Sequence, residues 1–315
     1  MSNLNIKEFI LGILAAASSI AVFWLWSNTA PFIVDGKFGE YENFIAPVAG
    51  LIAAAALFSL TALFIKNKWI VYPAAAISVG APYFFVSATN TVVGVLLASI
   101  LLAIYAVARI RAEGEHSLGF SASKFLKAGL PLYFTVASII ISTFIFSEIG
   151  EDENKAFAAL LPRSALKTAV GPVQSLIGLP DVKPNATVDE ALMGLIISQL
   201  KSQGIENISK TELTRLVASQ RAELSKNFGL KLSGQERLSD ILYEFVSVRF
   251  RELLGPYKIY LPYASAGAFF LAFKMFTYPL YYLTLLITFL LIKLMLAVNI
   301  LRREMQKVEV ERLTL

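Results

Sequence analysis

The stretch Phe9–Ser27, FILGILAAASSIAVFWLWS, contains no Asp, Glu, Lys, Arg or His. It has about the length that an α-helix needs to cross a hydrocarbon core of roughly 30 Å at 1.5 Å per residue. Four more stretches share this length and this lack of charge: Phe44–Ile65, Trp69–Ala88, Asn90–Ala108 and Ala128–Ser147. The sequence therefore predicts an all-α, polytopic transmembrane helical bundle, with the lipid bilayer as its first partner.

Composition supports a membrane protein and removes several kinds of chemistry. The chain is 56% hydrophobic and 16% charged, whereas soluble domains carry about 25% charged residues. It has no cysteine and a single histidine, His116, which excludes disulfides, thiolate metal sites, zinc sites with paired histidines and Ser–His–Asp triads. The spans hold no carboxylate for intramembrane proteolysis. We therefore expect no catalytic residues, no cofactor-binding residues and no metal site, and hence not an enzyme.

The first hydrophobic stretch is predicted to be a retained span rather than a cleaved signal peptide. A single Lys precedes it, it is longer than a typical apolar signal region, and Pro31 follows the one small-residue site at its end. Trp24 and Trp26 near that end are expected at the lipid–water interface, which indole rings favour.

Basic residues in the short loops predict the orientation. The side that holds the N-terminus carries seven of them: Lys7, Lys66, Lys68, Arg109, Arg111, Lys124 and Lys127. On the opposite side, the loops that precede the end of the fifth span contain one basic residue, Lys37. The positive-inside rule places the N-terminus in the cytoplasm and residues 148–258 outside the cell membrane.

The C-terminal apolar region, Ile259–Ile300, is long for one span and short for two. Pro279 is expected to break it, which favours two spans, Ile259–Phe276 and Pro279–Leu301, and seven in total. That reading puts the basic C-terminal tail outside, against the charge rule. The alternative is an interfacial first segment, six true spans and a cytoplasmic tail.

The domains predicted are a five-span bundle over 1–147, an extracytoplasmic helical domain over 148–258 and a two-helix hairpin with a charged tail over 259–315. Three capping boxes mark helix starts in the insert, at Thr187–Glu190, Ser209–Glu212 and Ser233–Glu236. An apolar stripe follows each, and Gly204, Gly229 and Gly255 mark the ends.

Two lysines lie within apolar sequence, Lys274 and Lys293, and are the intramembrane candidate residues. Lys274 is expected at the turn between the last two spans, and Lys293 is expected to extend towards the headgroups. Pro73, Gly80 and Pro82 predict a kinked third span. Three glycines, each followed by an alanine four residues later, are expected to allow close helix packing: Gly12, Gly50 and Gly94.

Two further patterns have ordinary explanations. The segment Ile208–Leu224 superficially resembles a helix-turn-helix, but nothing in it makes a turn and the insert is nearly neutral. No nucleic-acid partner is therefore expected. The acidic residues Glu148–Glu153 match no calcium loop and are expected to stabilise the start of a helix over Lys155–Leu161.

No motif identifies a family, so three functions are weighed. The first is a scaffold, assembly or partner-binding protein that uses the extracytoplasmic domain, with homo-oligomerisation open. The second is a transporter or channel component that uses the kinked spans. The third is an unrecognised membrane enzyme, which lacks the cluster of titratable groups that it would need.

Overall fold

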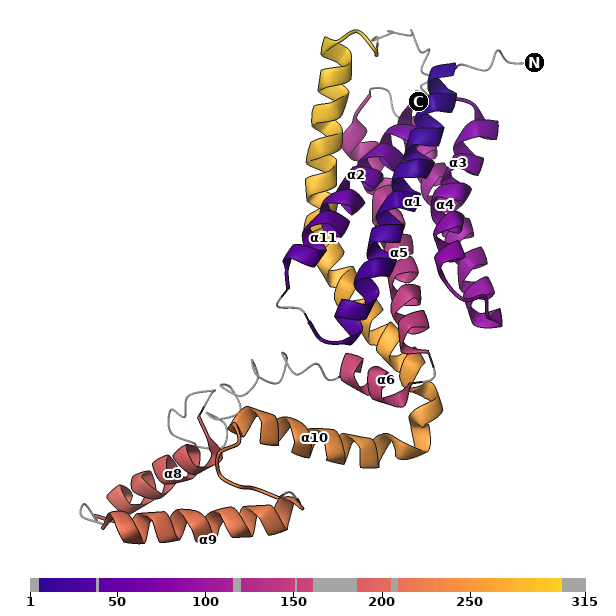
Figure 1. Ribbon diagram of the computed structural model, residues 1–315. Coiled ribbons are helices and arrows are strands. Elements are labelled where there is room, and N and C mark those ends of the chain that lie inside the picture. The colour runs from indigo at the N-terminus through magenta and orange to yellow at the C-terminus, as the bar shows by residue number, and fades with distance from the viewer. Residues whose placement is uncertain are drawn as a thin grey trace, which may run out of the picture. The chain divides into compact units, whose positions relative to one another are not determined.

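The fold is helical throughout the part of the chain that can be described. The computed structural model describes residues 6–37, 40–115, 120–150, 152–160, 186–204, 209–229 and 231–301 (Figure 1). The chain divides into two compact units, Met1–Glu151 with Pro262–Leu315, and Asp152–Leu261. We call them the membrane unit and the insert unit.

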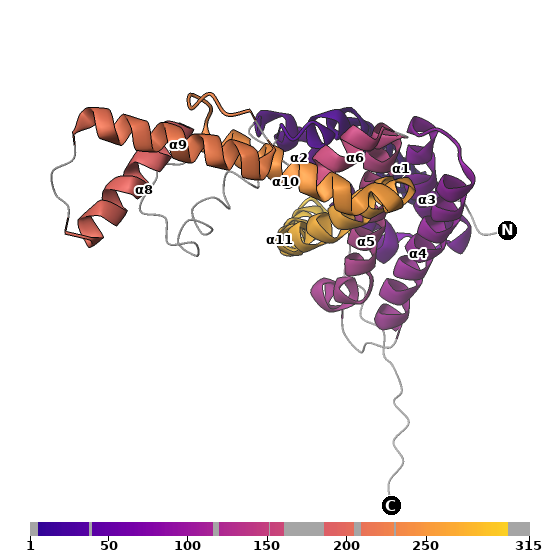
Figure 2. The same cartoon turned by 90° about the horizontal axis from the view of Figure 1, so that it is seen from below.

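The membrane unit is a bundle of long apolar helices, seen from one end in Figure 2. They are α1 (Ile6–Val34), α2 (Glu42–Phe64), α4 (Asn90–Glu115), α5 (Ala122–Ile149) and α11 (Leu261–Ala297). Among the described residues, five helical stretches are long and apolar enough to cross a membrane; the last runs over Ser239–Ala297 and takes its apolar part from α11. The membrane class predicted from the sequence is consistent with this result.

The third apolar stretch forms a broken helix, as its Pro and Gly residues predict. Helix α3 (Lys68–Gly80) ends after 13 residues, and the chain continues as the 3₁₀ helix η1 (Ala81–Phe85). Pro82 cannot donate a backbone hydrogen bond, so it disrupts the α-helical pattern at this point. The start of α3 is capped by Asn67, whose Oδ1 accepts a hydrogen bond from the Trp69 N–H at 2.9 Å.

The predicted hairpin of two spans at the C-terminus is wrong. Helix α11 runs without interruption over 37 residues and contains Pro279. A proline removes one backbone hydrogen bond, and a long apolar helix tolerates that loss when the remaining bonds hold it. Lys274 consequently lies well inside a continuous helix and not at a turn. The count of seven spans, which depended on this hairpin, is not supported.

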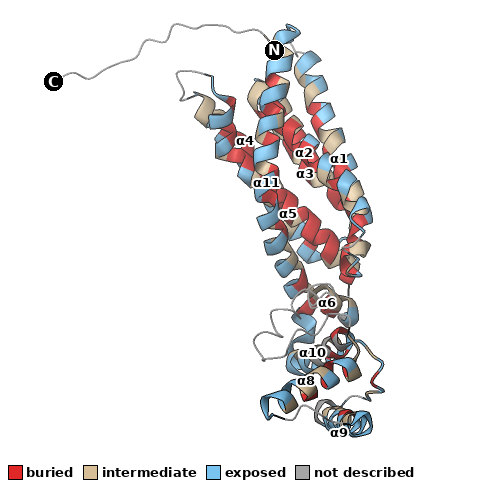
Figure 3. Ribbon diagram, turned by 90° about the vertical axis from the view of Figure 1, so that its left-hand side faces the viewer, coloured by how far each residue is buried: buried red, intermediate tan, exposed pale blue. Residues whose placement is uncertain are grey.

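Helix α5 forms the centre of the bundle. In the most apolar part of α5, 72% of the residues are buried, compared with 28% in α4 and 22% in the last candidate span. Figure 3 shows how the burial is distributed along the helices. Gly129 makes the α4–α5 contact possible, because a Cβ there would collide with the backbone carbonyl oxygen of Ala106. The ring of Tyr133 packs on Phe58 of α2 at 4.4 Å between centroids.

Two of the three expected small-residue contacts form. A Cβ on Gly50 would lie 2.8 Å from Cγ2 of Val22, and one on Gly12 would lie 3.4 Å from Cβ of Ala74. Gly94 has no atom within 4 Å of its Cβ position among the described residues, so it does not pack in this way.

Trp26, which was expected on the surface at the lipid–water interface, is buried among the helices. Helix α1 continues past Pro31 to Val34, which places Trp26 inside the bundle with 2% of its surface exposed. Its ring meets Phe273 of α11 edge-to-face at 5.1 Å. Trp24, by contrast, is 52% exposed.

The insert unit contains α6 (Glu153–Leu160), α8 (Val188–Ser202), α9 (Lys210–Phe228), α10 (Leu238–Leu254) and η2 (Gly255–Tyr260). Helices α8 and α9 pack side by side. Their apolar faces share one small core with α10, made by buried Val188, Leu192, Ile196, Val217 and Ile241. The predicted apolar stripes supply most of this core, although two residues that belong to those stripes, Leu216 and Leu253, are exposed.

Candidate functional site

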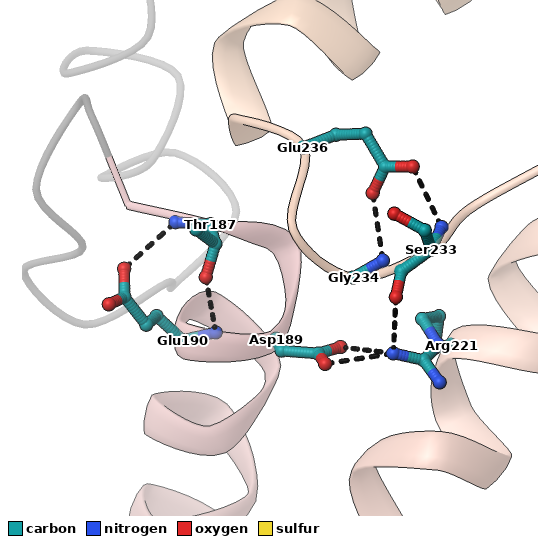
Figure 4. Close-up of polar contacts among 7 residues, drawn as sticks. All are labelled: Thr187, Asp189, Glu190, Arg221, Ser233, Gly234 and Glu236. Atoms are coloured by element: carbon teal, nitrogen blue, oxygen red, sulfur yellow. Dashed lines mark hydrogen bonds and ion pairs between the residues drawn. The ribbon is translucent and has the colours of Figure 1, made fainter.

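The N-terminus of α8 is closed by the predicted capping box. Thr187 Oγ1 accepts a hydrogen bond from the Glu190 N–H at 3.2 Å, and Glu190 Oε2 accepts one from the Thr187 N–H at 2.9 Å (Figure 4). The next two amides, of Val188 and Asp189, donate to the carbonyl oxygens of Glu236 and Gly234 at 2.9 and 3.1 Å. With these amides satisfied, the helix end offers no open anion site.

The second predicted capping box, at Ser209, forms in part, because the hydroxyl caps the helix but also donates to the Glu212 carboxylate in place of the Ser209 N–H. Ser209 Oγ accepts from the Glu212 N–H at 3.2 Å, and the Glu212 carboxylate accepts from the Ser209 hydroxyl at 3.3 Å. The Ser209 hydroxyl therefore bonds to both the backbone N–H and the side-chain carboxylate of Glu212.

The third predicted helix start, Ser233–Glu236, is wrong. Helix α10 begins two residues after Glu236, at Leu238, and Arg237 precedes it without a side-chain cap. The Glu236 carboxylate instead turns back onto the amides of Ser233 and Gly234, at 2.7 and 2.8 Å. These hydrogen bonds, above all those from Ser233, lower the pKa of Glu236 from 4.5 to about 2.

An ion pair joins α8, α9 and this turn. Arg221 Nη1 lies 2.8 Å from Asp189 Oδ2 and 3.1 Å from Oδ1, and it also donates to the Ser233 carbonyl oxygen at 2.8 Å. Figure 4 shows all three bonds converging on one nitrogen. Less than a third of either side chain is exposed, which reduces solvent screening.

Gly234 is required where the turn meets the ion pair. Its φ of 97° lies in the left-handed region that side chains rarely adopt, and a Cβ there would collide with Arg221 and Asp189. The turn, the ion pair and the capping box thus form one polar clamp, made by Thr187, Asp189, Glu190, Arg221, Ser233, Gly234 and Glu236.

Helix α9 turns one face to the core and the opposite face to solvent. Leu213, Val217 and Leu224 pack on the core. The exposed residues on the other side define the α9 surface: Thr211, Thr214, Arg215, Ala218 and Ala222. At 100° per residue the mean directions of the two sets lie about 140° apart. The clamp and the core therefore hold a rigid helix by one side and leave its other side open.

In the membrane unit, Lys274 contacts α5. Its Nζ donates to Thr135 Oγ1 at 2.6 Å and to the Pro131 carbonyl oxygen at 3.1 Å. The Thr135 hydroxyl itself donates to the same carbonyl at 2.9 Å. Lys274 is thus bound to neutral oxygens, and the described residues place no carboxylate within 4 Å of it.

Lys293 has a different environment. Its Nζ lies 4.7 Å from the centroid of the Phe289 ring, and the residue is four positions from the end of α11. It is therefore close enough to the end of the helix to extend towards it. The two lysines are 19 residues apart, about 28 Å along α11, so the structure does not bring them together.

The remaining polar candidates have structural surroundings. Asp152 Oδ1 accepts hydrogen bonds from the amides of Asn154 and Lys155 at 2.8 and 3.3 Å and so caps α6. This agrees with the helix-start role predicted for the acidic residues. His116 and Glu151 lie outside the described residues. Within the described ranges, no three His, Cys, Asp or Glu side chains are grouped as metal ligands.

Comparison with protein-family models, curated proteins and solved structures finds no match to this chain. The class of the protein comes from its fold alone. It is an all-helical protein with several apolar helices that are long enough to span a membrane.

Sequence reasoning did not find the partners in the clamp or those of Lys274. Arg221 and Asp189 are 32 residues apart, and Lys274 and Thr135 are 139 apart. One signal in the sequence does indicate the turn in the clamp: the pair Ser233-Gly234, because Gly after Ser is typical of a turn.

Proposed function

We propose that this protein holds a helical domain at the outer surface of the cell membrane, where the domain binds another protein. The observation that carries the proposal is the geometry of α9. A helix of 19 residues is fixed by core and clamp on one side and exposed on the other. A connection between two membrane helices needs only a few residues, so a folded unit with its own core suits a docking role.

The chemistry of the α9 surface suits a protein partner. Two alanines, Ala218 and Ala222, let another backbone approach closely, and two threonine hydroxyls offer hydrogen bonds. Arg215 supplies one positive charge, too little for binding to nucleic acid, which depends on many phosphate contacts. The proposal also allows contacts from the exposed faces of α8 and α10.

The proposal includes a topology of six crossings. Helices α1, α2, α4, α5 and α11 each cross once, and α3 with η1 makes the remaining crossing as a broken helix. A single crossing by α11 returns the chain to the side of the N-terminus. Arg302, Arg303, Lys307 and Arg312 then lie in the cytoplasm, which agrees with the positive-inside rule. The seven-span reading contradicted that rule.

Replacing residues 181–255 with a short Gly/Ser linker tests the proposal. The bundle is expected to insert as before, while the protein that co-purifies with the intact chain is lost. The Ala218→Arg variant, with its insert unit still folded, is expected to stop co-purifying with the same protein. The Ala218→Ser variant is expected to continue to co-purify with it. Retention of the partner by the linker chain would contradict the proposal.

Transport is the second candidate, and the broken third crossing favours it. Transporters place substrate sites where membrane helices are interrupted. Beside the break, Tyr83 Oη of η1 lies 3.0 Å from Ser99 Oγ of α4, and both residues are buried. If the linker chain preserved the cellular phenotype while Lys293→Ala abolished it, transport would replace the docking proposal.

A further inference from the structure

We infer that α11 pairs, at the depth of Lys274, with a membrane-spanning helix of a different protein that carries an Asp or Glu. This inference concerns the membrane unit alone. It does not depend on what the insert unit binds.

The depth of Lys274 follows from its register with α5. Lys274 contacts Thr135, and Tyr263 contacts Phe146 at 5.0 Å between ring centroids, so the two helices run antiparallel. In the uncharged run Ala128–Ser147 of α5, Thr135 lies 7 residues from one end and 12 from the other, about 10 Å and 18 Å at 1.5 Å per residue. Lys274 therefore lies inside the hydrocarbon layer, within about 5 Å of its centre.

The contacts of Lys274 solvate its charge only in part. An ammonium has three N–H donors, of which one meets the Thr135 hydroxyl and another the Pro131 carbonyl. Both acceptors are neutral, so the positive charge is not balanced. An ionised side chain at this depth is costly unless it is paired, which makes a counter-charge the missing part of this site.

This chain cannot supply that counter-charge from its apolar stretches. The five uncharged runs contain no carboxylate, and α11 contains none. A second copy has the same sequence and the same lack. A lipid phosphate lies outside the hydrocarbon layer, whose nearer edge is about 10 Å from Thr135 along α5, and the Lys274 ammonium is held at Thr135. The remaining source is another polypeptide with a carboxylate inside the membrane.

The surface beside Lys274 can accept a helix. Gly267, two turns away on the same face, has no atom within 4 Å of its Cβ position among the described residues, and Ala264 and Ala268 are exposed. A groove of about 210 Å³ between α4, α5 and α11 includes Gly267 and ends at Phe270, one turn from Lys274. Apolar side chains of a partner helix can enter this groove, and small residues favour such close packing.

The test uses the full chain in phosphatidylcholine vesicles, with a fluorophore on Ser121→Cys at the start of α5. The probe is a labelled Leu/Ala transmembrane peptide of about 20 residues with one central Glu, compared with the same peptide with a central Leu. Energy transfer is expected to show about tenfold tighter association of the Glu peptide. The preference is expected to vanish in Lys274→Leu and to persist in the matched control Lys293→Leu.

Equal association of the two peptides with the unmodified chain would overturn the inference, and this comparison needs no variant to fold. A preference that survived Lys274→Leu would also overturn it. Loss of the preference when anionic lipid is added to the vesicles would assign the site to a headgroup instead. The peptides lack any extramembrane domain, so failure here leaves the proposed function of the insert unit unaffected.

Discussion

Arg221 Nη1 lies 2.8 Å from Asp189 Oδ2, which ties the middle of α9 to the first turn of α8. The same nitrogen holds the Ser233 carbonyl oxygen at 2.8 Å, so one guanidinium connects two helices and the turn that precedes α10. The position of the α9 surface depends on this connection.

Arg221→Ala is expected to loosen the insert unit by about 1–2 kcal/mol, because it leaves a partly buried carboxylate and a carbonyl without their donor. Amide hydrogen exchange of α8 and α9 in the full chain measures this opening. Arg215→Ala, on the exposed side of the same helix, is the matched control and is expected to change it by less than about 0.5 kcal/mol. Equal effects of the two substitutions would show that the ion pair does not hold the helices.

Glu236 is expected to make the insert unit sensitive to acid. Its pKa is about 2 in the folded protein and 4.5 ordinarily, so the folded state binds this proton less readily than the unfolded state. The stabilisation is complete above pH 4.5 and is lost as pH falls from 4.5 towards 2. Glu236→Gln is therefore expected to flatten the dependence on pH in this window.

Hydrogen exchange, corrected for the intrinsic effect of pH on amides, measures that dependence. Glu244→Gln replaces an exposed carboxylate of α10 and serves as control. A carboxyl titration of Glu236 by ¹³C NMR with a midpoint near 4.5 would contradict the hydrogen-bonded turn.

Local signals were sufficient for most helix boundaries, and they failed where distant contacts decide. The Thr187 and Ser209 caps depend on residues three positions apart, so the sequence shows both partners. At Ser233 the same pattern forms a turn, because Gly234 fits beneath Arg221, 13 residues earlier. Pro279 was expected to end a helix, but the effect of a proline inside an apolar helix depends on the packing around it.

Gly129→Ala is expected to destabilise the bundle by about 1–3 kcal/mol, the usual cost of an atom forced into a packed interface. The Ala106 carbonyl oxygen occupies the space that the new Cβ needs. Gly94→Ala is the matched control, since nothing lies within 4 Å of it among the described residues and alanine favours helix. Thermal aggregation of the detergent-solubilised chain measures both; equal stability of the two variants would contradict the close α4–α5 contact.

The six-crossing topology predicts which residues a reagent outside the cell can reach. The chain contains no cysteine, so a single introduced thiol reports one position. Ser219→Cys, exposed on α9, is expected to react with an impermeant maleimide in intact cells, whereas Ser121→Cys and Thr314→Cys are not. Labelling of Thr314→Cys alongside Ser219→Cys would support seven crossings, and labelling of Ser121→Cys alone would reverse the orientation.

The most direct test of the docking role is photocrosslinking in living cells from a benzoylphenylalanine residue at Ala218. Leu101 of α4, 67% exposed on the membrane unit, is the matched control in an apolar surface. The docking proposal predicts a discrete adduct with one other protein from Ala218 and from its neighbour Thr214, and none from Leu101. Absence of an adduct from both α9 positions, in a chain that still co-purifies with its partner, would contradict the claim that the insert unit binds it.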